Sequence, residues 1–123
     1  MIAENIVSAE TGVERILHYI IEKKGEDIVV IDLRGISSVS DFFIITTGTS
    51  NTHLKAIADE VHEKLKQKYG MKPWHIEGYK AGKWVLLDYV DIVVHIFDAD
   101  TRSYFSLENL WKDANIRRIE TDD

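Results

Sequence analysis

The chain has 123 residues, of which 15 are Lys or Arg and 21 are Asp or Glu, so its formal net charge is −6. Apolar residues make up 45% of the chain, which is enough to bury a core and excludes an intrinsically disordered protein. The absence of cysteine excludes disulfide frameworks, thiolate metal sites and cysteine nucleophiles.

Charge and hydropathy also limit the cellular location and the binding partners that can be expected for the protein. No basic stretch precedes an apolar segment at the N-terminus, and no apolar run approaches the roughly 18 residues that a membrane span needs. An acidic protein is repelled by nucleic-acid phosphates unless its basic residues cluster. We therefore expect a cytoplasmic protein with no membrane contact and no sequence-specific binding to nucleic acid.

The first three predicted elements are a helix and two strands. An apolar stripe recurs at helical spacing and consists of Val13, Ile16, Leu17, Ile20 and Ile21. Thr11 and Glu14 match a capping box at the start of this helix, and Gly25 suits its end. Runs of β-branched residues over 28–33 and 42–47 then predict two buried strands.

A second helix and three more strands follow. The turn at 48–52 offers several N-cap residues, and the apolar spacing after it predicts a helix that ends at Gly70. Strands are predicted over 74–77, 84–89 and 91–97.

The last predicted helix carries Leu107, Leu110 and Trp111, and residues 118–123 are expected to form a flexible acidic tail. The order α-β-β-α-β-β-β-α predicts a single α/β domain over residues 1–123, with a mixed sheet of about five strands flanked by helices. One β-α-β crossover is expected between the second and third strands, with antiparallel pairing elsewhere.

Two motifs leave an enzymatic alternative open. Asp98 and Asp100 form an Asp-x-Asp pair that could hold magnesium, and with Gly48 and Ser50 they sketch a metal-dependent nucleotidyl or phosphoryl transferase. In such enzymes the carboxylates follow the glycine turn on the next strand, whereas here about 50 residues intervene. The simpler prediction is that Ser50 and Asp98 cap helices, with no metal or other cofactor.

The strand predicted over 84–89 is apolar on both of its faces. Alternation places two sets of side chains on opposite faces: Trp84, Leu86 and Asp88 against Val85, Leu87 and Tyr89. One face can serve the core, and the other has to be covered by a helix, a second copy of the chain or a different protein. Five carboxylates against two lysines over residues 74–100 favour a basic protein surface as the partner. His75 and His95 lie on flanking strands and are expected to be hydrogen-bonded core histidines.

Several motifs, in their order and spacing, closely resemble the ribosomal silencing factor family, RsfS, also called Iojap. They are Asp41-Phe42-Phe43-Ile44-Ile45, Gly48-Thr49-Ser50, Trp84 to Tyr89, Asp91 to Phe97, Tyr104, Leu107-Glu108 and Leu110-Trp111. The resemblance implies a factor without catalysis that binds the large ribosomal subunit through universal large-subunit protein fourteen. It would block joining of the small subunit and repress translation. The resemblance further implies homodimers and a nucleotidyltransferase-like core without catalytic carboxylates.

Carried over by position, the resemblance implies a contact surface on one strand and the segment before it. Its members are Trp84, Leu86, Asp88 and Tyr89, with Glu77 and Tyr79 beside them. The indole would supply apolar area, and the carboxylates would meet Lys or Arg of the ribosomal protein. Val90 stands where the family motif has glycine, and because a β-branched residue resists positive φ, the turn there is expected to differ.

Overall fold

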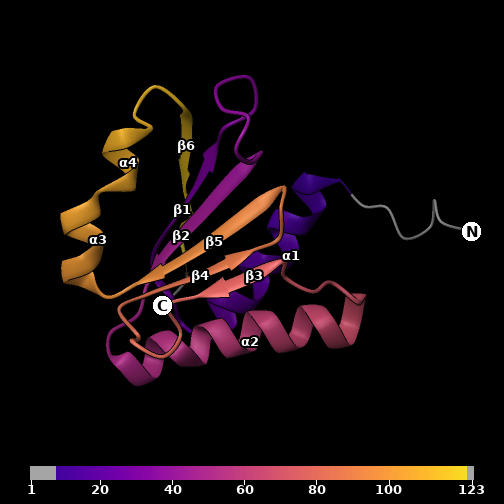
Figure 1. The fold of residues 1–123 in the computed structure, drawn as a ribbon, viewed down its shortest axis with the longest axis vertical. Coiled ribbons are helices and arrows are strands. Elements are labelled where there is room, and N and C mark those ends of the chain that lie inside the picture. The colour runs from indigo at the N-terminus through magenta and orange to yellow at the C-terminus, as the bar shows by residue number, and fades with distance from the viewer. Residues whose placement is uncertain (1–7, 122–123) are drawn as a thin grey trace, which may run out of the picture.

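The computed structural model describes residues 8–121, which form one mixed sheet with helices on both faces (Figure 1). The helices are α1 (Ala9–Glu22), α2 (Asn51–Tyr69), α3 (Ala99–Phe105) and α4 (Leu107–Leu110). The strands are β1 (Glu26–Asp32), β2 (Phe42–Thr47), β3 (His75–Glu77), β4 (Trp84–Asp88), β5 (Ile92–Phe97) and β6 (Asn115–Arg118). The predicted α/β class and mixed sheet are confirmed. No helix within the described range is both long and apolar enough to cross a membrane.

The sheet contains six strands in the order β3-β4-β5-β2-β1-β6. β2 and β5 run parallel, and every other neighbouring pair is antiparallel. The chain does cross from β2 through α2 to β3, but β3 lies at the edge and β5 takes the place beside β2. Burial explains this order, because all residues of β5 are buried while those of β3 are exposed.

The start of α1 differs from the prediction. The Ser8 side chain caps the helix by accepting a hydrogen bond from the Thr11 N–H at 3.1 Å, so the predicted capping box at Thr11 and Glu14 is wrong. Ser8 is an equally good cap, and one more helical turn brings the Gly12 N–H to the Ser8 carbonyl. Gly25 lies beyond the helix end, where Lys24 takes the left-handed conformation.

The other helix boundaries show which local signals sufficed. Ser50 caps α2 by accepting from the His53 N–H at 3.0 Å, and Gly70 ends it with φ of 66°, as predicted. The final helix is two short ones, because Ser106 between them adopts φ of 47°.

The predicted tail begins too early. Arg118 ends β6, which pairs with β1, and the Ile119 N–H donates to the Ile28 carbonyl. The sixth strand was missed because its four residues include only one apolar side chain, Ile116. Residues 122–123 lie outside the described range.

The two faces of the sheet have separate cores. On one face, α1 and α2 pack over β2, β4 and β5 in a cluster that includes Ile16, Ile20, Leu54, Ile57, Val85, Leu87 and Val94. On the other face, α4 and the residues after it pack over β1, β2 and β5 in a cluster that includes Val29, Ile31, Phe43, Ile45, Phe97 and Leu107. The second core therefore lies over only part of the sheet.

Candidate functional site

We call the face of the sheet that α4 packs on the α4 face. The pairing of the strands arranges its side chains in rows across the sheet. One row runs from the edge inward through Glu77, Leu86, His95, Ile45 and Val29. The next row contains His75, Asp88, Val93, Phe43 and Ile31, and a third contains Trp84, Phe97 and Thr47. Each row begins on β3 or β4. The first two rows end under the second core, and the third ends at Thr47, which Arg102 contacts. The face thus has two halves, an outer half on β3 and β4 and an inner half on β5, β2 and β1.

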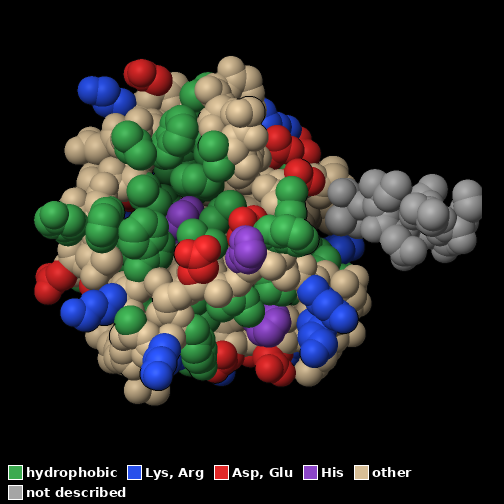
Figure 2. All heavy atoms as spheres, viewed as in Figure 1, with side chains coloured by type: hydrophobic (Ala, Val, Ile, Leu, Met, Phe, Trp, Pro, Cys, Tyr) green, Lys and Arg blue, Asp and Glu red, His purple; other side chains and the backbone are tan. Residues whose placement is uncertain are grey.

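Only the inner half is fully covered. Leu107, Trp111 and Ile116 pack against it, and its residues on β2 and β5 are buried. The outer half consists of His75, Glu77, Trp84, Leu86 and Asp88, of which the first two are exposed and the others partly exposed. Figure 2 views this side and shows hydrophobic side chains gathered over α3, α4 and the adjoining part of the sheet, with acidic groups and histidines beside them over the middle of the sheet. This mixture matches the chemistry of protein-binding surfaces.

Trp84 stands at the boundary between the halves. Its ring lies 4.7 Å from that of Phe97 and 4.8 Å from that of Phe105, measured between centroids. Its indole N–H donates a hydrogen bond to His95 Nδ1 at 3.1 Å. Phe105 of α3 therefore covers one side of the indole, in line with the sequence alternative that a helix covers this face. The rest of the indole stays accessible and is held in one orientation.

His95 is the buried support of this indole. It is 4% exposed, and burial lowers its pKa to about 4, so the ring is neutral near pH 7. Because Nδ1 accepts from Trp84, the ring proton lies on Nε2, and Nε2 has no partner among residues 8–121. The prediction of a hydrogen-bonded core histidine is confirmed for His95, whose partner is the Trp84 indole, and is wrong for His75, which is exposed on β3.

The two carboxylates of the outer half have different surroundings. Asp88 Oδ1 accepts a hydrogen bond from the Val90 N–H at 2.8 Å, which holds the turn into β5. Val90 adopts φ of 74° there, the left-handed conformation that glycine favours, so the expectation that its β-branch would change the turn is wrong. Glu77 is exposed and forms no ion pair with any described cation. Glu77 is therefore the carboxylate that remains available.

The two tyrosines expected at the contact surface lie elsewhere. The Tyr79 hydroxyl donates to Asp59 Oδ2 at 3.0 Å, and this hydrogen bond raises the pKa of Tyr79. Tyr79 thereby ties the β3–β4 loop to α2. Tyr89 packs on the core of α1 and α2, and burial raises the pKa of its hydroxyl. The structure brings Glu77, Trp84, Leu86 and Asp88 together and separates both tyrosines from them.

A notch of about 190 Å³ opens beside the indole and is lined by Glu77, Gly78, Trp84 and Leu86. Gly78 has φ of 79°, and a Cβ at this position would lie 1.9 Å from the Trp84 carbonyl oxygen. Only glycine therefore allows the hairpin to close here. Sequence reasoning missed the notch, and it also missed His95 and Phe105 as supports of Trp84, because no local pattern joins these three residues.

The residues of the enzymatic alternative act as helix caps. Ser50 caps α2, and Asp98 Oδ1 accepts from the Thr101 N–H at 2.8 Å at the start of α3. Hydrogen bonding with the side chain and the backbone N–H of Thr101 lowers the pKa of Asp98. Both capping predictions are confirmed. Over residues 8–121, no group of three or more His, Cys, Asp or Glu side chains is arranged to hold a metal ion.

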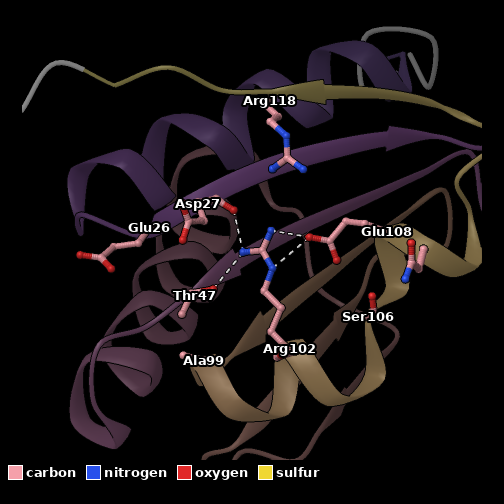
Figure 3. Close-up of a pocket in the computed structure, with 10 residues that line it drawn as sticks. Glu26, Asp27, Thr47, Ala99, Arg102, Ser106, Glu108 and Arg118 are labelled. Carbon is pink, nitrogen blue, oxygen red and sulfur yellow. Dashed lines mark hydrogen bonds and ion pairs between the residues drawn. The ribbon is translucent and has the colours of Figure 1, made fainter.

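A larger hollow of about 470 Å³ lies between the start of β1 and helices α3 and α4 (Figure 3). Arg102 reaches across it and donates to the Asp27 carbonyl at 2.6 Å, to Thr47 Oγ1 at 2.9 Å and to Glu108 Oε2 at 2.7 Å. Through these hydrogen bonds the Arg102 guanidinium holds α3 and α4 on the sheet. The polar groups that line the hollow therefore serve to attach the two helices.

Comparison with known proteins supplies the biological context. A family model described as "Ribosomal silencing factor during starvation" matches residues 7–123. The chain is 42% identical over 99 residues to the ribosomal silencing factor RsfS of Halalkalibacterium halodurans. The aligned region covers 80% of this chain and 84% of that protein.

Two further proteins are similar to this chain, one with a solved structure and one with a name that refers to mitochondria. A crystal structure of a Chromobacterium violaceum protein aligns with a TM-score of 0.82 at 33% identity and covers 86% of this chain and 88% of that one. The mouse protein named "Mitochondrial assembly of ribosomal large subunit protein 1" is 30% identical over 110 residues. That match covers 85% of this chain and 47% of the mouse protein.

Proposed function

The chain belongs to the ribosomal silencing factor family, and on this premise we propose that it represses translation by binding the large ribosomal subunit and excluding the small one. The contact is universal large-subunit protein fourteen, and the contact surface is the outer half defined above. Such a protein acts where ribosomes are, so we place it in the cytoplasm.

One observation supports this use of the outer half. Trp84 and Leu86 stay partly exposed on a sheet whose neighbouring half is fully buried. A rigid indole surrounded by polar groups is typical of the central anchor of an interface, where Trp is enriched. Glu77 and Asp88 give the anchor an acidic border, and a ribosomal protein of basic character complements it.

Repression by obstruction needs affinity and volume, and no turnover of a substrate. A standard protein interface buries about 800 Å² on each partner. A folded domain seated on the joining surface prevents the small subunit from docking for as long as it stays bound. The strength of repression then follows occupancy, which is set by the dissociation rate.

The decisive experiment is a subunit-joining assay. Purified large and small subunits are mixed with saturating protein, and intact ribosomes are quantified by sedimentation. We expect fewer intact ribosomes, with the protein in the large-subunit fraction. Equal joining with and without the protein would rule out obstruction, and retention by the small subunit would rule out the proposed partner.

The rival function is a metal-dependent nucleotidyl or phosphoryl transferase that uses Gly48, Ser50, Asp98 and Asp100. A thermal-shift screen with ATP, CTP and magnesium separates the two. Ligand-induced stabilisation that disappears in Asp98→Ala would favour the enzyme, and the comparison is made within each variant because this substitution also removes a helix cap.

A homodimer that acts only as a scaffold is the third option. In that case the protein would form dimers in solution, and no ribosomal particle would retain it. We propose that any self-contact uses or borders the outer half. Large subunits would then lower the dimer fraction, which sedimentation of the labelled protein can measure.

A further inference from the structure

We propose that the notch beside Trp84 binds one arginine side chain of the partner protein, an inference that rests on the proposed function. The residues that would receive it are Glu77, Trp84 and Leu86, which line the notch together with Gly78. Glu77 is thereby the charged group that recognises the partner, and Asp88 is a structural residue of the neighbouring turn.

The size and walls of the notch suit one long side chain. Its volume of about 190 Å³ is below the roughly 300 to 1,000 Å³ of pockets for drug-sized ligands. Leu86 and the indole form apolar walls on two adjacent positions of the same strand face. An aliphatic stem of three or four methylene groups fits between such walls while its charged end remains near water.

Charge decides which side chain this is. The Glu77 carboxylate has no ion-pair partner among the described cations, and it lines the notch together with the indole ring. A cation placed there gains both the carboxylate and the face of the aromatic ring. Arginine fits better than lysine because its planar guanidinium can bind the carboxylate through two N–H groups and stack on the indole at once.

Asp88 cannot take the same role as readily. Its Oδ1 already accepts from the Val90 N–H, and this contact holds a β-branched residue at positive φ. Recruiting that oxygen to an arginine would weaken the turn between β4 and β5. The two carboxylates of the outer half therefore divide into one for recognition and one for architecture.

The notch is rigid before anything binds. His95 holds the indole through the hydrogen bond to its N–H, and Tyr79 ties the loop after Gly78 to α2. Asn51 adds hydrogen bonds to the carbonyls of Ala81 and Gly82 in the same loop, each of 3.2 Å. A preformed site loses less conformational entropy on binding, so a single contact of this kind can contribute measurably to affinity.

The first test compares Glu77→Gln with Glu63→Gln in co-sedimentation with purified large subunits. Glu63 is an exposed residue of α2, which packs on the opposite face of the sheet, so the two variants lose the same charge at different places. We expect Glu77→Gln to raise the dissociation constant about tenfold and to reduce its dependence on salt, with thermal stability unchanged. Glu63→Gln should bind like the parent protein. Equal affinity of both variants would overturn the arginine notch.

The second test needs no ribosome. N-acetyl-arginine amide and N-acetyl-leucine amide are titrated into the ¹⁵N-labelled protein, and the Trp84 indole signal is followed. We expect the arginine compound to shift it in the parent protein and not in Glu77→Gln. An equal response to the leucine compound, or none to either, would overturn the proposal. Failure of the parent protein to sediment with large subunits would instead refute the proposed function, and this titration would still decide the notch.

Discussion

The inner and outer halves of the α4 face are both made of alternating side chains, from neighbouring strands of one sheet, yet they differ in what lies on top of them. Ile45 and Phe97 of the inner half are inaccessible to solvent, whereas Leu86, two strands over in the same row as Ile45, is partly exposed. After β5 the chain turns through α3 and α4 toward β1 and β6, away from β3 and β4 (Figure 1). The path of the chain, and not the hydropathy of the strands, decides which half remains free for a partner.

The attachment of the covering helices is the feature that separates the halves. α3 and α4 are short, and isolated helices of this length are not stable in water. Arg102 binds Glu108 at one end of the pair and the start of β1 at the other, while Trp111 meets Phe43 edge to face. These contacts explain how two short helices can keep the inner half dry.

The largest expected effect comes from breaking that attachment. Arg102→Met should lower the free energy of unfolding by about 3 kcal/mol, because it leaves Glu108 and Thr47 in a largely buried place without their partner. Urea denaturation measures the change. Arg117→Met is the matched control, since its ion pair with Glu14 is exposed and should contribute less than about 1 kcal/mol. Equal losses in both variants would mean that Arg102 does not fasten the helices.

The next effect is a pH dependence at the boundary between the halves. His95 stays neutral in the folded protein down to pH about 4, whereas a histidine in the unfolded chain takes up a proton near pH 6.5. The unfolded state therefore binds more protons in this interval, and the free energy of unfolding should fall by about 3 kcal/mol as the pH falls from 6.5 to 4.

The control for this dependence is His95→Phe, which removes the titrating group and the unpartnered Nε2 together. Its free energy of unfolding should be much less sensitive between pH 6.5 and 4.5, as measured by urea denaturation at each pH. The same variant loses the acceptor for the Trp84 N–H, so its indole signal should show faster hydrogen exchange. A parent protein with no slope in this interval would contradict the role assigned to burial.

A smaller effect is expected from the outer half itself. Trp84→Ala should weaken binding to large subunits by roughly 2 kcal/mol, about thirtyfold, because it removes the anchor of the surface. It should also lower thermal stability, since the indole packs on Phe97 and Phe105. Trp74→Ala offers a control at a more exposed indole just before β3. Co-sedimentation in which both variants bind equally would remove Trp84 from the interface.

The smallest effect concerns the turn next to Asp88. Val90→Gly should raise the free energy of unfolding by about 1 kcal/mol, because glycine adopts φ of 74° without the strain that a β-branched residue carries there. Thermal denaturation measures the gain, and binding to large subunits should stay the same. A loss of stability would show that the flexibility of glycine in the unfolded chain outweighs the strain.

The predictable part of the protein lies in features that a few neighbouring residues decide. Ser50, Gly70 and Asp98 were identified as helix boundaries from sequence because a cap depends on groups within about four positions of the chain. The same holds for the separation of Trp84, Leu86 and Asp88 from Val85 and Leu87, since alternation along a strand is a property of its backbone. The likeness to a nucleotidyltransferase core stays a prediction.

The unpredictable part depends on which distant segments pack together. Local periodicity could not show that β5 lies beside β2, that Arg118 belongs to a sixth strand, or that Tyr89 points into the core of α1 and α2. It also could not choose which half of the α4 face is covered. By itself the sequence determined most of the helices and strands and the two-faced character of β4, because short-range geometry governs both. The tertiary structure alone decided the free half, because burial is shared among residues that the chain keeps far apart.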